Sequence, residues 1–170
     1  MDNSELSLMA DKPSQLPMLG WREWVALPEF GIAQMKAKID TGARSSALHA
    51  VTLEPYQKGG ENWLMFTVQP KQKQGEQLIE CHAPIKDRRL VSDSGGHKQR
   101  RYVIETQLLF GQQLIQAEIT LTNRDSMRFR MLLGRTAMNR HFLINPNGSY
   151  LQGKPSEVSY NALLNSKNLD

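Results

Sequence analysis

The chain has 170 residues, of which 39% are hydrophobic and 22% are charged. This length suits one domain with its own hydrophobic core, and it excludes a two-lobed enzyme that carries each half of an active site on a separate domain. The formal net charge of +4 is concentrated in residues 86–140, where nine Arg and two Lys stand against five acids, a local charge of +6. A basic segment allows an acidic peptide, a nucleic acid or an anionic membrane surface as partner, without choosing among them.

The N-terminal residues carry neither a basic start nor an apolar stretch, and no apolar run approaches the ~20 residues of a membrane span. One cysteine, Cys81, excludes an intramolecular disulfide and is typical of a reducing compartment. We therefore expect a cytoplasmic protein that contacts no membrane. Residues 1–19 are predicted to be a flexible leader and residues 152–170 a flexible tail, with one domain at residues 20–151 between them.

Short runs of strand-forming residues separated by turn residues dominate this domain. Gly111 and the stretch from Pro28 to Gly31 are typical hairpin turns. Only residues 136–142 have a helical pattern. The sequence therefore predicts an all-β domain, a barrel or a sandwich, with one short helix. Six runs pair into three predicted hairpins: residues 21–27 with 33–39, 63–68 with 78–81, and 101–110 with 114–121.

The histidines and the cysteine form no metal-binding motif. They stand singly apart from the adjacent Cys81 and His82, and neighbouring side chains of a strand point to opposite faces, which prevents chelation by that pair. A glycine loop of the phosphate-binding type is absent, so we expect no ATP binding. Because the possible metal ligands lack a binding spacing, we also expect no metal, and we expect no other cofactor. Cys81 without a paired histidine is no nucleophile candidate. The side chains expected in the core, or directly behind a site, are Trp21, Trp24, His49, Trp63, Phe66 and Cys81.

The sharpest local feature is Asp40-Thr41-Gly42-Ala43, which directly follows an apolar strand. Gly42 permits a tight turn that holds the Asp40 carboxylate at the strand end in one orientation. One carboxylate is a poor catalyst of amide hydrolysis, whereas two that share a proton can activate water and protonate the carbonyl oxygen. By itself, an Asp-Thr-Gly triplet indicates only a structural turn, because such triplets recur by chance.

A second feature, Leu132-Leu133-Gly134-Arg135, ends an apolar strand and opens the predicted helix. The two features in this order, with a hairpin candidate at Ser94-Gly95-Gly96 between them, resemble the retropepsin-like aspartic proteases. That resemblance implies a closed β-barrel with one short helix, a flap hairpin over the cleft, and a homodimer in which each protomer supplies one aspartate. Because the spacing from Asp40 to Gly134 exceeds that of a minimal retropepsin, a supplementary hairpin is expected around residues 54–85.

Longer stretches resemble a bacterial subfamily of these proteins that is labelled as ATP-dependent zinc proteases. In this resemblance Asp40 is the catalytic residue, while Thr41 bonds across to the partner's loop and Gly134 lets its strand pass close behind the turn. Arg135 would tie the interface together. The alternative for Thr41 is a small polar turn residue, for Gly134 an ordinary helix-entry glycine, and for Arg135 a surface cation. The implied active-site loop and dimer support consists of Thr41, Gly42, Ala43, Gly134 and Arg135. The matching stretches are residues 20–25, 37–50, 92–97, 121–125 and 129–136.

Arginines surround the implied cleft. Arg44 stands where retroviral enzymes commonly have an acid, and it could favour the ionised form of a nearby carboxylate, bind a substrate carboxylate, or equally well form an interface salt bridge. The flap candidate is cationic on both arms, which fits either an acidic substrate or a solvated hairpin. The substrate-binding candidates are Arg44, Arg88, Arg89, Ser94, Gly95, Gly96, Arg100 and Arg101.

Together these features predict an aspartic peptidase, active as a homodimer, that cleaves an acidic, glutamate-rich peptide or protein tail. Members of the resembled family often accompany ATP-grasp ligases that add glutamates to protein tails, which points to trimming of such tails. The alternative is a catalytically silent module of the same fold that binds acidic tails. Nucleic acid is disfavoured as a partner, because the sequence does not interleave aromatic and basic residues on one strand face.

Overall fold

The computed structural model describes residues 16–71, 77–123, 128–156, 161–162 and 165. Residues 1–15 of the predicted leader and most of the predicted tail lie outside this part. The chain also contains a 3-10 helix, η2 (Pro28–Phe30), and a short α-helix, α2 (Arg135–Met138). The strands are β1 (Met18–Leu19), β2 (Arg22–Leu27), β3 (Ile32–Ile39), β4 (Ser46–His49), β5 (Thr52–Lys58), β6 (Glu61–Val68), β7 (Ile79–Pro84), β8 (Asp87–Ser92), β9 (Lys98–Phe110), β10 (Gln113–Thr122), β11 (Met131–Leu133) and β12 (Leu143–Ile144).

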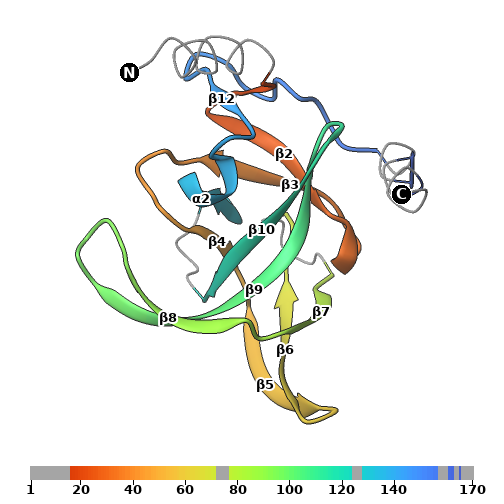
Figure 1. Ribbon diagram of the computed structural model, residues 1–170, viewed down its shortest axis with the longest axis vertical. Coiled ribbons are helices and arrows are strands. Elements are labelled where there is room, and N and C mark those ends of the chain that lie inside the picture. Colours follow the sequence, from red (N-terminus) through yellow and green to blue (C-terminus); the bar gives the residue numbers. More distant parts are fainter. Residues whose placement is uncertain (1–15, 72–76, 124–127, 157–160, 163–164, 166–170) are drawn as a thin grey trace, which may run out of the picture.

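Six strands close into a barrel (Figure 1). Their order is β10-β4-β11-β3-β2-β9, and antiparallel pairing of β9 with β10 closes the ring. Strand β8 extends the sheet on the far edge of β9 and forms one arm of a hairpin that curves away from the barrel. The predicted all-β barrel with a short helix is confirmed. The helix ends at Met138 rather than at residue 142, because Asn139 already has non-helical backbone angles.

The three predicted hairpins are confirmed as β2–β3, β6–β7 and β9–β10. The supplementary element around residues 54–85 is a three-stranded sheet, β5-β6-β7, rather than a single hairpin. Strand β5 escapes sequence reasoning because its polar residues show no apolar alternation. A turn signal was present, however: Gly59 and Gly60 both have positive φ, as a two-residue hairpin turn between β5 and β6 requires.

Aliphatic side chains fill the barrel core, which includes Leu27, Met35, Leu48, Ile104 and Leu133. Of the residues expected in the core, Phe66, Cys81 and His49 are buried. The expectation for the tryptophans was wrong: Trp21 is 38% exposed, and Trp24 and Trp63 are only half-buried. Each of the three packs a ring face against a cationic side chain at the surface, so its burial is partial.

The two ends of the described domain meet at Glu23, whose side chain is fully buried. Its carboxylate accepts hydrogen bonds from the backbone amides of Gly20, at 2.6 Å, Leu151, at 3.1 Å, and Gln152, at 3.0 Å. Strand β1 also pairs in parallel with β12. Leu19 and Gln152, which composition places in the leader and the tail, are therefore packed against the barrel by long-range contacts.

Candidate active site

The Asp-Thr-Gly turn begins where β3 leaves the barrel. The Asp40 amide donates to the carbonyl of Leu133 on β11, at 2.9 Å, so the turn starts beside the strand that precedes Gly134. The Gly42 amide donates to Asp40 Oδ1, at 3.0 Å, and the Ala43 amide donates to the Asp40 carbonyl, at 3.3 Å. These bonds fix the orientation of a half-buried carboxylate, as a catalytic group requires.

The backbone behind this turn is packed without room for a side chain at Gly134. A Cβ there would lie 2.5 Å from the Ser45 carbonyl oxygen. The Arg135 amide donates to the Ala43 carbonyl, at 2.9 Å, and Arg135 Nη1 donates to the Thr41 carbonyl, at 3.0 Å. Gly134 and Arg135 thus hold the turn from within the same chain, and the Arg135 side chain does so while it stays exposed.

A cleft of about 1010 Å³ opens beside the turn. Of the predicted site residues it brings together Asp40, Gly42, Ala43, Arg44, Arg89, Ser94 and Arg101. The others do not line it: Thr41, Gly134 and Arg135 form or support the turn, and Arg88, Gly95, Gly96 and Arg100 lie elsewhere on the flap. The remaining lining residues are Ser45, Ala47, Leu90, Val91, Ser92, Asp93, Val103, Glu118, Thr120, Thr122, Leu132 and Thr136.

The flap is the hairpin of β8 and β9, and Asp93 organises its tip. Asp93 Oδ1 accepts hydrogen bonds from the amides of Gly95 and His97, both at 2.9 Å. Gly96 adopts a left-handed conformation, with φ of 80°, that favours glycine. Ser94, Gly95 and Gly96 therefore shape the tip, and an aspartate two residues before a glycine was the available signal for the role of Asp93.

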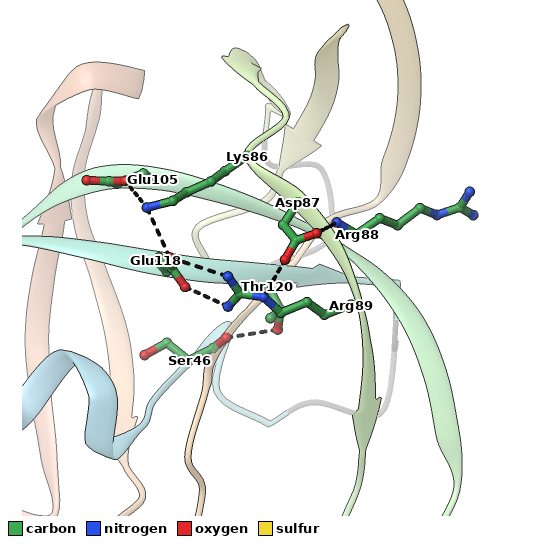
Figure 2. A network of polar contacts seen from close by, with 8 residues as sticks. All are labelled: Ser46, Lys86, Asp87, Arg88, Arg89, Glu105, Glu118 and Thr120. Atoms are coloured by element: carbon green, nitrogen blue, oxygen red, sulfur yellow. Dashed lines mark hydrogen bonds and ion pairs between the residues drawn. The ribbon is translucent and has the colours of Figure 1, made fainter.

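An ion network joins the base of the flap to the barrel (Figure 2). Arg89 Nη1 lies 2.6 Å from Glu118 Oε2, and Arg89 Nε lies 2.7 Å from Asp87 Oδ2. Lys86 contacts both Glu118 and Glu105. These two glutamates face each other directly on β10 and β9, an unfavourable like-charge pair that Lys86 neutralises. The network therefore connects β8, β9 and β10, and two of its members, Arg89 and Glu118, line the cleft.

The network changes the role expected for two flap arginines. Hydrogen bonds from Arg89 and Lys86 lower the pKa of Glu118 to about 2, and the hydrogen bond from Arg89 lowers the pKa of Asp87. Arg89 lines the cleft, but its guanidinium is already paired, so it supplies little uncompensated charge. The guanidinium of Arg88 stacks over the ring of Tyr102, at 5.0 Å, and its side chain extends away from Glu118 in Figure 2.

The described cleft is less cationic than the sequence indicates, because Arg44, Arg89 and Arg101 are balanced there by three acids. Arg101 is only 7% exposed, and its guanidinium donates to Gln99 and, at 3.4 Å, to Thr120. Arg44 is exposed and has no ion pair in the described part of the chain. It is thus the cleft cation best placed to bind an anion.

Sequence reasoning missed several residues that build the site. Glu118 is the acceptor that Arg89 and Lys86 share in the network. The Thr120 hydroxyl donates a hydrogen bond to the Ser46 carbonyl, at 2.8 Å, behind the turn. The Ser46 hydroxyl in turn accepts from the Gly134 amide, at 3.0 Å. These residues carry no local signal, since polar residues on a strand gain their roles only when β4, β10 and β11 come together.

No group of three or more possible metal ligands occurs among the residues that the structure describes. Burial raises the pKa of the Cys81 thiol to about 12, so the thiolate needed for nucleophilic attack is scarce at neutral pH. Within the same residues, no helix has the length and apolar character needed to cross a membrane.

We expect Glu118→Gln to lower the melting temperature of the protein mainly above pH 5. A carboxylate with a lowered folded-state pKa stabilises the fold above its unfolded pKa of about 4.5, and this contribution is lost as pH falls toward 2. The difference in melting temperature between wild type and variant should therefore shrink from pH 6 to about pH 2. Thermal unfolding across this range measures it, with Glu54→Gln, an exposed glutamate on β5, as control. A difference that stays constant with pH would contradict the network.

Comparisons with known proteins agree with this geometry. A sequence model of a family described as RimB-like, "Retropepsin-like aspartic endopeptidase RimB", matches residues 18–155. The protein of unknown function Lpg0085 from Legionella pneumophila has a crystal structure that superposes with a TM-score of 0.66 at 26% identity. That match covers 80% of this chain and 98% of the other.

Two curated relatives are both named "Probable alpha-L-glutamate ligase". The protein from Shewanella pealeana is 38% identical over 150 residues, which cover 88% of this chain and 33% of the relative. The protein from Desulfotalea psychrophila is 40% identical over 142 residues, which cover 84% and 31%. The chain thus spans about a third of the length of the curated relatives it matches.

Proposed function

Because the chain belongs to the RimB-like family of retropepsin-like aspartic endopeptidases, we propose that it hydrolyses peptide or isopeptide bonds as a homodimer whose two Asp40 residues activate water. The observation that carries this proposal is Asp40 in the wall of the cleft, with Oδ1 fixed by the Gly42 amide. Thr41 and Gly42 are exposed, which leaves the turn accessible to a second copy. Two such turns face to face would complete a site of which one chain carries half.

In the proposed mechanism the two carboxyl groups share one proton, because neighbouring like charges disfavour double ionisation. The ionised member takes a proton from water as the water oxygen attacks the carbonyl carbon, and the protonated member gives its proton to the carbonyl oxygen. The C–N bond of the tetrahedral intermediate then breaks as its nitrogen takes the proton that came from water, and a hydroxyl of the intermediate returns a proton to the dyad. One water is consumed, and a carboxylic acid and an amine are formed.

The proposed substrate is a glutamate-rich peptide or protein tail. Arg44 supports it, because an exposed guanidinium without an ion pair in the described chain can bind a carboxylate through two parallel hydrogen bonds. The relatives' name, a probable glutamate ligase, connects this family with glutamate. We propose hydrolysis rather than ligation for this chain, because its cleft holds the aspartate turn.

A peptide panel tests the substrate class. Wild type is expected to cleave oligoglutamate faster than neutral or basic peptides of equal length, and Arg44→Gln should lower kcat/KM for oligoglutamate by about tenfold. Arg100→Gln is the matched control, because Arg100 is also an exposed arginine next to the site but does not line the cleft. Cleavage products are quantified by mass spectrometry. A preference for neutral peptides, or equal losses in both variants, would contradict an acidic substrate.

The same panel separates the enzyme from the second candidate, a silent module that binds acidic tails. Arg44 favours that function too, since it can hold a carboxylate whether or not hydrolysis follows. Wild type that binds oligoglutamate through Arg44 in calorimetry, yet cleaves no peptide as a verified dimer, would establish the binding module and refute the peptidase.

A further inference from the structure

A ladder of aromatic rings and cations covers the outer face of the β2–β3 hairpin. The Arg22 guanidinium lies over the rings of Trp21, at 4.5 Å, and Tyr150, at 4.9 Å. Tyr150 stacks on Trp24 with ring centroids 5.4 Å apart and an interplanar angle of 27°. None of these residues lines the cleft, so the ladder is a separate surface.

Two lysines add to this ladder at the Trp24 ring. Lys36 Nζ lies 5.3 Å and Lys154 Nζ 5.1 Å from the centroid of the Trp24 ring. Lys38 stands directly opposite Arg22 in the β2–β3 register, a like-charge pair that costs stability within the sheet. In the part of the chain that the structure describes, none of these four cations forms an ion pair with a carboxylate. The face is therefore positive and uncompensated.

Tyr150 joins the ladder in a strained backbone conformation. Its backbone has φ of 54°, the left-handed region that non-glycine residues rarely adopt. Its amide donates to the Arg22 carbonyl, at 2.9 Å, and Arg22 Nε donates to the Ser149 hydroxyl, at 3.3 Å. Strain of this kind persists where the surrounding structure enforces it, and it is common at binding sites.

We propose that this aromatic–cationic face, formed by Trp21, Arg22, Trp24, Lys36, Lys38, Tyr150 and Lys154, binds single-stranded nucleic acid. Its four cations contact consecutive phosphates, and an unstacked base lies on Trp21, which is 38% exposed. The ring of Tyr150 holds Arg22 in place, and the ring of Trp24 holds Lys36 and Lys154.

The aromatic component favours nucleic acid over an acidic protein tail. Carboxylates of a tail would pair with the four cations alone, and the exposed ring of Trp21 would add nothing specific to them. Nucleobases stack on aromatic rings while phosphates pair with cations, so a single strand makes use of both components of the face. A duplex keeps its bases stacked internally, so it would contact only the cations.

Fluorescence anisotropy of the full chain with a labelled single-stranded RNA tests the proposal. The logarithm of the binding constant should fall with the logarithm of salt concentration with a slope of about −3, and the double variant Lys36→Gln with Lys38→Gln should halve that slope to about −1.5. Trp21→Ala, at an exposed ring, should weaken RNA binding by about tenfold and leave the salt slope unchanged. The matched control is Lys58→Gln, because Lys58 stacks over Trp63 at 4.2 Å on the separate β5–β6 hairpin; it should bind like wild type.

Two competitors complete the design. Oligoglutamate of equal charge and duplex RNA should each bind more weakly than the single strand, and Trp21→Ala should not alter either. No RNA binding at physiological salt would overturn the proposal. Equal binding of oligoglutamate, with loss in the lysine variant but not in Trp21→Ala, would instead assign the face to acidic peptides. Circular dichroism of each variant establishes that a loss of binding is not a loss of fold.

Discussion

Asp40→Asn is expected to lower the rate of peptide cleavage by about 10²–10⁴-fold while leaving the fold intact. In the proposed homodimer, an asparagine cannot share a proton with the partner's residue 40, so neither water activation nor protonation of the carbonyl oxygen can proceed. Its side-chain oxygen can still accept the hydrogen bond from the Gly42 amide that now reaches Asp40 Oδ1, at 3.0 Å. The turn should therefore survive, and the measurement is the initial rate on oligoglutamate at matched dimer concentration.

Asp93→Asn is the matched control for this experiment. Asp93 is the other aspartate in the cleft, and an asparagine there can keep the hydrogen bonds from the amides of Gly95 and His97 that shape the flap tip. We expect Asp93→Asn to lose far less activity than Asp40→Asn. Equal activity of wild type and Asp40→Asn would refute the aspartic mechanism. Equal and large losses in both variants would show a dependence on cleft charge rather than on the Asp40 dyad.

Gly134→Ala is expected to destabilise the barrel by about 3 kcal/mol, which for a domain of this size lowers the melting temperature by about 10 °C. The added Cβ would sit 2.5 Å from the Ser45 carbonyl oxygen and 2.9 Å from the Arg44 carbonyl oxygen. Both atoms belong to the backbone that follows the Asp-Thr-Gly turn, so neither can move aside cheaply. Because any shift displaces the turn, activity should fall even at temperatures where the variant is folded.

The control for this substitution is Gly95→Ala at the flap tip. A Cβ at Gly95 would meet His97 Nδ1 at 3.1 Å, and that side chain is exposed and can rotate away. Thermal unfolding of both variants should show a clear loss for Gly134→Ala and a small one for Gly95→Ala. Similar melting temperatures for wild type and Gly134→Ala would contradict the close packing of β11 behind the turn.

The sequence by itself determined the all-β class, three hairpins and the order of the site elements. These features rest on short-range patterns: alternating apolar residues in strands, glycines in turns, and an aspartate and a glycine that each directly follow an apolar strand. The composition could not reveal where the domain ends, because Leu19 and Gln152 are packed by contacts with residues more than a hundred positions away.

The tertiary structure decided which charges are available. Within residues 86–140, whose charge of +6 indicates an arginine-rich cleft, Arg89 is paired with Glu118 and Asp87. Arg88 is stacked on Tyr102, and Arg44 is the exposed cation without an ion pair among the described residues that line the cleft. Strand pairing alone brings these partners together, and the charge of a chain carries no information on pairing across strands.

Among the described residues, the positive face without ion pairs lies instead on the β2–β3 hairpin, which belongs to the part of the chain that the charge count leaves without excess cations. Lys154 and Tyr150 join Arg22 and Trp24 there from the opposite end of the sequence. An inspection of single strands could not find this interleaving of rings and cations, because it is assembled from two segments that only the folded barrel places side by side. The sequence determined where the Asp-Thr-Gly turn lies, and the packing of distant segments decided which of the described surfaces carry cations without ion pairs.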